Sequence, residues 1–434
     1  MTKPMTNKPH AAVDRNRLWH GRSLFFAASF GRLLGVMTLA ALPFGTLEFI
    51  LPLYVLVLGG SPSLIGLLVG VGAATGVLMR PLAGWLADRG RIGLVLHGGA
   101  ASLMFGMGCW ALTSDSRVLL LGRVAVSAGI AGLGLAAQIL VAALVAPHQR
   151  AAGFGRLAAA SAVGHIIGAI IAVFVLVLWD AETQHEAQTM LLGLNISVRL
   201  PVPLDRIDAL HLLFGAFALG MGAALLLTVG RWPRTTNITQ RVSFTQTWRS
   251  VAQNPALRRL IVVGLLISIG YSLAVPMLLP LLQDSFDAGL GALAIAYAIP
   301  GILYAAAPAT LGRLADRWGR RRSATVGIWM SAVVYTSLPI LPALTWVAVV
   351  WSAEALAYSL YVPALQALLV DAAPEQERGA TFGLYSVVAG LGAVVAAPLG
   401  GVLYQYIAPE APFLLSALTL LGAGVVVRRQ ANRP

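Results

Sequence analysis

The chain has 434 residues, of which 58% are hydrophobic and only 11% are charged, and its mean hydropathy is +0.80. A soluble globular domain is about 45–50% apolar and about 25% charged, so the composition argues against a soluble enzyme. It also excludes disorder, because disordered chains are rich in charge. A single cysteine, Cys109, argues against a secreted disulfide scaffold. In a soluble protein the net charge of +13 would indicate a nucleic-acid partner, so the positions of the charges matter.

Apolar segments of the length that crosses a bilayer, roughly 20 residues, recur along nearly the whole chain. The sequence therefore predicts an all-α integral membrane protein with twelve transmembrane helices. In the first half they are expected at residues 33–57, 63–86, 93–113, 118–146, 154–179 and 209–230. In the second half they are expected at residues 257–283, 291–315, 323–343, 345–370, 379–407 and 410–428. Several are longer than the minimum, so we expect kinks, with Pro43, Pro300 and Pro363 as candidate sites.

The segments between these spans divide the chain into two helical bundles. Residues 1–32 are expected to be an N-terminal tail, in which residues 18–31 mix aromatic side chains with arginines as an interfacial helix does. The bundles are expected at residues 33–230 and 257–428, joined by a central loop at 231–256 and followed by a short tail at 429–434. The long loop at 180–208 matches no motif that indicates a function.

Basic residues mark one side of the predicted membrane protein. If both termini lie on one side, 26 of the 30 Lys and Arg residues fall there, in the tails, the central loop and alternate short loops. The opposite side holds only Arg117, Arg199 and Arg206. Because loops rich in Lys and Arg stay in the cytoplasm, we expect both termini to be cytoplasmic and the protein to lie in the plasma (inner) membrane. A nucleic-acid-binding protein would concentrate its charges on one helix or tail, so no nucleic-acid partner is expected.

Short motifs repeat in the two halves at a constant separation of 228 residues. GWLADRGR begins at Gly84 and GRLADRWGRR begins at Gly312. Two further matches have the same separation: Pro52-Leu53 with Pro280-Leu281, and Arg150, Phe154 and Gly155 with Arg378, Phe382 and Gly383. Three motifs in register are not expected by chance, so the chain is predicted to be a parallel repeat of two six-helix units. Transporters are often built from such repeats, with the substrate site between them near the bilayer midplane.

The repeated loop, GxxxDRxGRR, resembles the signature loop of the major facilitator superfamily. The second copy is complete, and the first is one residue shorter. The resemblance implies that family's fold, two six-helix bundles related by a pseudo-twofold axis. It also implies that the loop is a conformational latch that stabilises the outward-facing state. The latch residues would be Gly84, Asp88, Arg89, Gly312, Asp316 and Arg317.

The residue types of this loop suit a latch. The two glycines would let a neighbouring helix approach closely. The two aspartates lie at helix ends, where they can accept hydrogen bonds from the N-terminus of a neighbouring helix. The two arginines can pair with those acids or with lipid phosphates. The alternative is that these basic loops only set the membrane topology.

Three ionisable residues lie clearly inside predicted spans: Glu48, Arg123 and Glu354. Each such group costs about 2.5–3.5 kcal/mol at the bilayer centre on insertion scales, so each is a candidate functional residue. The resemblance implies that the first, fourth, seventh and tenth spans line the central cavity, and these three residues lie on such spans.

Glu48 is the candidate for proton coupling, because a carboxyl group in a partly dry cavity can take up a proton from one side and release it on the other. The alternative is a fixed ion pair or a structural acid. Arg123 cannot lose its proton in a protein, so it would tune a nearby acid or hold an anionic group. The alternative for Arg123 is a side chain that extends to the outer interface.

Glu354 shares one helical face with Tyr358 and Tyr361. An acid flanked by aromatic rings suits a cationic or amphipathic substrate through charge and cation–π attraction, and the alternative is packing between helices. His165 lies between Gly164 and Gly168, where the family's antiporter motif has proline. It can titrate near physiological pH, although packing is the simpler explanation. In the eleventh span, Ala397, Pro398 and Gly401 match that motif better.

Several kinds of chemistry are missing from the sequence. No lysine follows Lys8, which argues against a Walker A loop, and no Cys/His cluster indicates a metal. We therefore expect a transporter, not an enzyme, with no cofactor and with the proton gradient as its energy source. Its expected partners are the bilayer, protons and a small-molecule substrate, and it is expected to be a monomer.

Within the family, the residues favour the drug and metabolite proton-antiporter branch, with efflux of a hydrophobic or cationic small molecule. Two alternatives remain open: a proton-coupled uptake symporter, favoured by His165 in place of proline, and a non-transporting membrane sensor on the same fold.

Overall fold

The computed structural model describes residues 12–145, 150–179, 206–230, 232, 244–286, 290–374 and 377–429. Ten of the described helices are long and apolar enough to cross a membrane, and a bent helix at the N-terminus makes an eleventh. The predicted span at 291–315 is divided between α11 (Leu290–Ala306) and α12 (Pro308–Trp318), and neither piece is long enough alone. The predicted all-helical membrane architecture is confirmed.

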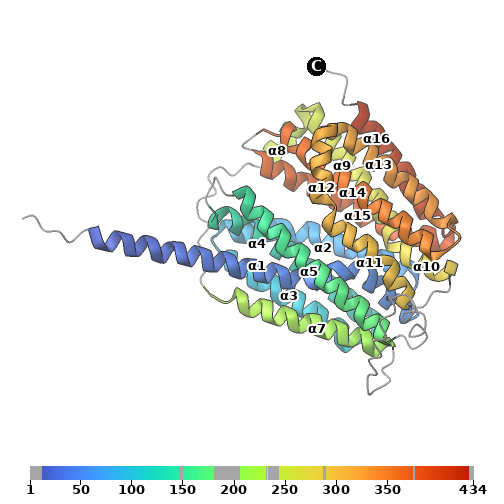
Figure 1. The fold of residues 1–434 in the computed structure, drawn as a ribbon, viewed down its shortest axis with the longest axis horizontal. Coiled ribbons are helices and arrows are strands. Elements are labelled where there is room, and N and C mark those ends of the chain that lie inside the picture. Colours follow the sequence, from blue (N-terminus) through green and yellow to red (C-terminus); the bar gives the residue numbers. More distant parts are fainter. Residues whose placement is uncertain are drawn as a thin grey trace, which may run out of the picture.

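The described part of the first half contains six long helices. They are α1 (Ala12–Val57), α2 (Pro62–Asp88), α3 (Ile92–Leu112), α4 (Ser116–Leu144), α5 (Arg150–Trp179) and α7 (Arg206–Thr228). The long loop predicted at 180–208 lies almost entirely outside the described residues. The segment predicted as an interfacial helix is continuous with the first span in α1, which extends well beyond the bundle (Figure 1).

The second half begins with a short helix, α8 (Phe244–Gln253), in the predicted central loop. The first spanning segment after it consists of α9 (Pro255–Ala274), the 3-10 turn η2 (Val275–Met277) and α10 (Leu278–Phe286). After α11 and α12 come α13 (Arg320–Ser337), the 3-10 turn η3 (Leu338–Ile340), α14 (Leu344–Ala372), α15 (Arg378–Tyr406) and α16 (Ala411–Arg428).

The first and seventh spans break at equivalent positions of the repeat. α1 bends by 41° between Phe44 and Phe49, and η2 interrupts the seventh span. Each break ends three residues before one of the repeat-equivalent prolines, Pro52 and Pro280, and the second break also contains Pro276. A proline lacks the N–H that would bond the carbonyl four residues earlier and clashes with it. Pro52 therefore explains the bend in α1 better than the predicted Pro43.

The other predicted kink sites do not break their helices. Pro300 and Pro363 lie inside α11 and α14, which continue through them. The eighth span breaks instead at Ala307, next to Pro308.

Two opposite ends of the bundle can be distinguished by their turns. We call the end with the α2–α3 and α12–α13 turns the basic face, and the end with the α1–α2, α3–α4 and α15–α16 turns the far face. At the far face of the first half, the Tyr54 hydroxyl lies 2.8 Å from His211 Nε2 and 3.1 Å from the Thr113 carbonyl. His211 Nε2 also lies 3.3 Å from Ser114 Oγ. These contacts join α1, the α3–α4 turn and α7.

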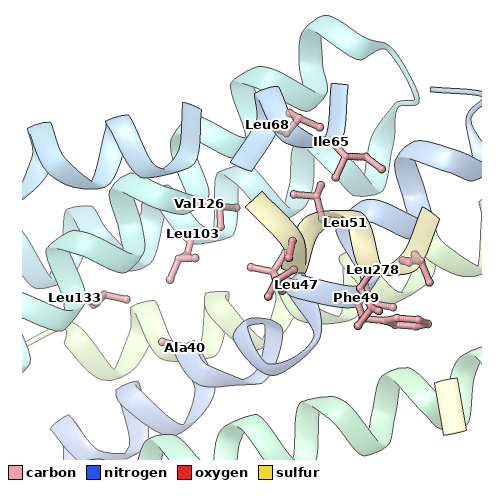
Figure 2. Close-up of a cluster of buried hydrophobic side chains, with 14 of the residues drawn as sticks. Ala40, Leu47, Phe49, Leu51, Ile65, Leu68, Leu103, Val126, Leu133 and Leu278 are labelled. Carbon is pink, nitrogen blue, oxygen red and sulfur yellow. The ribbon is translucent and has the colours of Figure 1, made fainter. Parts of the chain in front are cut away.

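The helices of each half form a group of their own, drawn from blue to green for the first half and from yellow to red for the second (Figure 1). One apolar core nevertheless runs through both groups. Figure 2 shows Leu278 of α10 beside Phe49 of α1, with Leu51 and Ile65 nearby. The Phe49 ring also lies 4.7 Å from the ring of Tyr297 in α11. The two halves are therefore packed together around the bend of α1.

The longest contact between the halves is the one between α2 and α15. At Gly66, a Cβ would lie 2.4 Å from the Ala397 carbonyl oxygen, and at Gly70 it would lie 2.7 Å from the Pro398 ring. At the far-face end, the Ser63 N–H donates to Gln405 Oε1 at 3.3 Å. Glycine lets the two backbones approach to these distances, so the α2–α15 contact depends on Gly66 and Gly70.

Candidate substrate and coupling site

The residues predicted on one face of the tenth span gather in the core of the second half. Glu354, on α14, is 0% exposed, and Trp351 and Tyr361 are also buried. Tyr358 is half-buried, and its ring lies 5.6 Å from that of Tyr361 and 5.2 Å from that of Tyr304 on α11. The structure therefore brings Glu354, Tyr358 and Tyr361 together, as predicted.

Glu354 faces two hydroxyl groups of the neighbouring helix α13. Ser331 and Tyr335, one turn apart on that helix, are buried and interact electrostatically with the Glu354 carboxyl group. Among the described residues, none of the four oxygen atoms, Ser331 Oγ, Tyr335 OH and Glu354 Oε1 and Oε2, has a hydrogen-bond partner of good geometry. A buried polar group without a partner is costly, so this cluster is a candidate site for a proton or a small polar ligand.

Sequence reasoning missed Ser331, Tyr335 and Tyr304. They lie on other helices, and no pattern within α14 points to them. The sequence did contain one signal of the site: Ser331 and Tyr335 are polar residues, four apart, inside the apolar span predicted at 323–343. The edge contacts of Trp351 with Tyr335 at 5.9 Å and with Tyr304 at 6.5 Å show that α11, α13 and α14 build the cluster jointly.

Arg123 of α4 lies over the backbone of α2. Its Nε donates a hydrogen bond of 3.1 Å to the Leu68 carbonyl oxygen. A Cβ on Gly72 would lie 2.4 Å from the same Nε. Glycine at position 72 therefore makes the space in which the guanidinium group rests, and Arg123 lies within the first half instead of extending freely to the outer interface.

The side chain of Glu48 lies outside the described part of the structure, so its predicted coupling role stays a prediction. His165 of α5 is half-buried, and its ring centroid lies 5.5 Å from that of Phe44 on α1. The glycines on either side of His165 bring α5 against α1: a Cβ on Gly164 or Gly168 would overlap the carbonyl oxygens of Thr38 and Leu42, respectively. Gly164 and Gly168 therefore serve the close packing of α5 against α1, and the role of His165 stays a prediction.

In the second copy of the signature loop, Arg320 connects two helices. Its Nε lies 2.8 Å from Asp316 Oδ1, and its Nη1 lies 2.6 Å from Asp371 Oδ2 at the end of α14. Asp316 is thus paired with Arg320. Arg317, for which either an acid or a lipid phosphate was the expected partner, is exposed. Gly319, at φ 92°, makes the turn between α12 and α13, a conformation that favours glycine.

In the first copy, the charged residues are arranged differently. Arg89 stacks on Trp85, with its Cζ 3.4 Å from the ring centroid, and Asp88 is exposed. Of the two partners expected for Arg89, Asp88 or a lipid phosphate, the described structure shows no pair with Asp88. Gly90, at φ 73°, takes the place of Gly319 in the shorter turn.

The glycines that begin the two signature loops, Gly84 and Gly312, are not in tight contact with a neighbouring helix. A Cβ on Gly84 would lie 3.8 Å from Leu135, and one on Gly312 would lie 3.6 Å from Pro363. These are ordinary van der Waals distances, so the close helix approach predicted at Gly84 and Gly312 is absent in this conformation. The described contacts of these latch residues stay within their own half.

Among the described residues, no group of three or more His, Cys, Asp or Glu side chains could hold a metal ion.

Known proteins resemble this chain in fold. The bacterial homologue of the human lysosomal transporter Spinster, in its inward-facing and unoccupied conformation, has a TM-score of 0.71 and 19% identity over 94% of this chain and 95% of that one. The nucleoside transporter NupG has a TM-score of 0.70 and 14% identity over 94% of this chain and 100% of that one. A POT family transporter has a TM-score of 0.69 and 13% identity over 92% of this chain and 95% of that one.

At these identities the structural likeness establishes the fold. The relatives are varied transporters and indicate no particular antiporter branch. A search of curated proteins gave no significant match. The model of the Major Facilitator Superfamily, however, matches residues 33–307 and 260–434. The chain therefore belongs to the Major Facilitator Superfamily, and it is a secondary transporter of the membrane and not an enzyme.

Proposed function

We propose that this protein exports a hydrophobic or cationic small molecule in exchange for protons, by alternating access between its two halves. The observation that supports this most is the cluster of aromatic side chains around the buried carboxyl group of Glu354. Tyr358 and Tyr304 are its half-buried members, and their rings offer a surface for an apolar or cationic ligand. The negative charge that Glu354 acquires on losing a proton would attract a cation to that surface.

The basic face is proposed to be cytoplasmic, in the plasma (inner) membrane, because most Lys and Arg residues outside the spans lie toward it. With this orientation, the contact of Ser63 with Gln405 lies on the outer side, and we propose that it is one of the contacts that close that side. We further propose that the signature loops act as latches that stabilise the outward-facing conformation, with Asp88 free to accept a partner when the inner ends of the halves approach.

Glu48 and Arg123 are proposed to act together in the first half, with Glu48 exchanging protons and Arg123 setting the local charge. His165 lies beside Phe44 and is proposed to contact the substrate path. The protein is proposed to work as a monomer.

A flux assay with the protein reconstituted in vesicles tests this function. A pH gradient is imposed, and pooled dyes and metabolites are screened for gradient-dependent transport. Proton movement opposite to the substrate supports antiport, and movement in the same direction would replace export with the symport alternative. The absence of flux with every ligand would favour a sensor.

A substitution of Glu48 tests its proposed role in proton coupling separately. Glu48→Gln should abolish gradient-driven transport but leave exchange of labelled for unlabelled substrate intact, because exchange needs no net proton movement. Normal gradient-driven transport by Glu48→Gln would remove Glu48 from the coupling mechanism.

A further inference from the structure

We infer that Ser331, Tyr335 and Glu354 form a proton-holding site in the second half, and that Glu354 carries the proton while the far face is closed. This inference rests on the proposed function, in which protons drive transport, but it concerns residues that the sequence did not connect. It also changes the role of Glu354. A fully buried carboxyl group cannot touch a substrate in this conformation, so Glu354 serves the proton, and Tyr358 is left to meet the ligand.

The burial of the site is the first reason. Glu354 is 0% exposed, and the only described groups beside its oxygen atoms that can hydrogen-bond to them are the Ser331 and Tyr335 hydroxyls, neither at good geometry. An ionised carboxylate in such surroundings would cost several kcal/mol unless a cation paired with it. A neutral carboxyl group avoids that cost.

The groups that face the site from each neighbouring helix are hydroxyls and aromatic rings. They are Tyr335 and Ser331 from α13, Tyr304 from α11, Tyr271 from α9, Tyr385 from α15, and Trp351, Tyr358 and Tyr361 from α14 itself. The charged residues of the packed helices lie near the basic face: Arg258 and Arg259 on α9, Arg313, Asp316 and Arg317 on α12, Arg320, Arg321 and Arg322 on α13, Asp371 on α14, and Arg378 on α15. The proton is thus the positive charge that fits the site.

The two hydroxyl groups can serve both protonation states of Glu354. A hydroxyl both donates and accepts. The neutral acid can donate its O–H to either Ser331 Oγ or Tyr335 OH. When water reaches the site and takes the proton as hydronium, the remaining carboxylate can accept hydrogen bonds from both hydroxyls. Small rotations of three side chains therefore accompany the loss and gain of one proton.

Movement between the halves can open the site, because α11 touches both. Tyr304 of α11 covers Tyr358 and Trp351, and Tyr297 of the same helix packs against Phe49 of α1 in the first half. The helix is also separated from α12 at Pro308. When the far face opens, α11 must break one of these contacts, and water then has a route to Glu354.

Infrared difference spectroscopy of the purified full-length protein tests the site without any ligand. The wild type at neutral pH should show the C=O stretch of a protonated carboxyl group, and Glu354→Gln should lose one such band. Tyr335→Phe and Ser331→Ala should shift its frequency, because each removes a hydrogen-bond partner. Ser416→Ala is the matched control: Ser416 Oγ is another buried hydroxyl without a partner in the described residues, and its loss should leave the band unchanged.

A flux measurement completes the test. Tyr335→Phe should lower gradient-driven accumulation of substrate about tenfold, the effect of losing one hydrogen bond to a charged group. If Glu354→Gln does not fold, Glu354→Asp should move the band and change the pH profile of transport. A band that is unchanged in Glu354→Gln, or in both Tyr335→Phe and Ser331→Ala, overturns the inference. If wild-type protein shows the band but transports nothing, the proposed function fails while the proton-holding site stands.

Discussion

At the scale of single residues, the size of a neighbour decides where Arg123 can rest. The guanidinium group lies where a Cβ on Gly72 would be, and it donates to the Leu68 carbonyl oxygen. A fixed positive charge in the membrane interior is costly, so its position inside the first half depends on this space. The sequence alone identified Arg123 as a candidate but not Gly72, because the two meet only when α2 and α4 pack.

Gly72→Ala should therefore displace Arg123 from Leu68. The side chain can move aside, so we expect a modest loss of stability, about 1–2 kcal/mol, and a clear loss of transport. Gly76→Ala, one turn further along α2, is the control, because no atom lies within 4 Å of a Cβ there. Melting temperature in detergent and vesicle flux measure both effects. Equal results for Gly72→Ala and Gly76→Ala would contradict this role of Gly72. If Arg123 is first replaced by alanine, adding Gly72→Ala should cost little further stability. An undiminished further loss would also contradict the role.

The residues near Glu354 show what a sequence can predict about a site. Helical spacing alone placed Glu354, Tyr358 and Tyr361 on one face, and the structure confirms their proximity. Ser331 and Tyr335 could not be predicted from that spacing, because their approach depends on which faces of α13 and α14 pack. Burial of Glu354 was also beyond the sequence, since an intramembrane acid is equally compatible with a wet cavity.

At the scale of helices, the contact of α2 with α15 depends on glycines that face backbone atoms. A carbonyl of the opposite helix cannot move aside as a flexible side chain can. A Cβ on Gly66 would therefore force the two helices apart at Ala397, next to the far-face contact between Ser63 and Gln405.

Gly66→Val should shift the protein toward a conformation that is open at the far face. Gly76→Val is the matched control on the same helix, where there is open space. In a Cys109→Ala background with Gln405→Cys, labelling by a membrane-impermeant thiol reagent should become several-fold faster in Gly66→Val than in the control. If the labelling rates are the same, the α2–α15 contact does not hold the far face closed.

The α12–α13 turn gives a second prediction at this scale. Arg320 bridges Asp316 and Asp371, and all three side chains are more than a third exposed. Exposed ion pairs contribute about 0.2–1 kcal/mol and are screened by salt. The bridge lies within the second half, and in the first half Asp88 is exposed with no such bridge described.

Asp371→Asn should therefore lower the melting temperature slightly at low ionic strength, and the difference should vanish in concentrated salt. Asp88→Asn should leave the melting temperature unchanged under both conditions, because Asp88 is exposed in this conformation. Thermal unfolding of both variants in detergent, at low and at high salt, measures this. A loss in Asp371→Asn that does not respond to salt would show that the bridge has some other structural role.

At the scale of the whole molecule, the repeat read from the sequence reappears in the structure. Equivalent prolines follow the breaks in the first and seventh spans, and one apolar core joins the halves. The spans and the repeat were predictable because a bilayer requires apolar segments of about 20 residues, and because the same motifs recur 228 residues apart. The positions of the helix breaks were only partly predictable: Pro52 and Pro308 accompany breaks, whereas Pro300 and Pro363 lie in continuous helices. The effect of a proline depends on how neighbouring helices support the backbone around it.

Alternating access requires the contact at the far face to open and close in every cycle. The most direct test joins the halves there with a short thiol-reactive reagent that reduction cleaves, using Ser63→Cys and Gln405→Cys in a Cys109→Ala background. The control pair, Ser114→Cys and His211→Cys, lies at the same face but within one half. Joining residues 63 and 405 should stop transport in vesicles and reduction should restore it, while the control pair should transport in both states. Full transport with the halves joined would contradict alternating access through this contact.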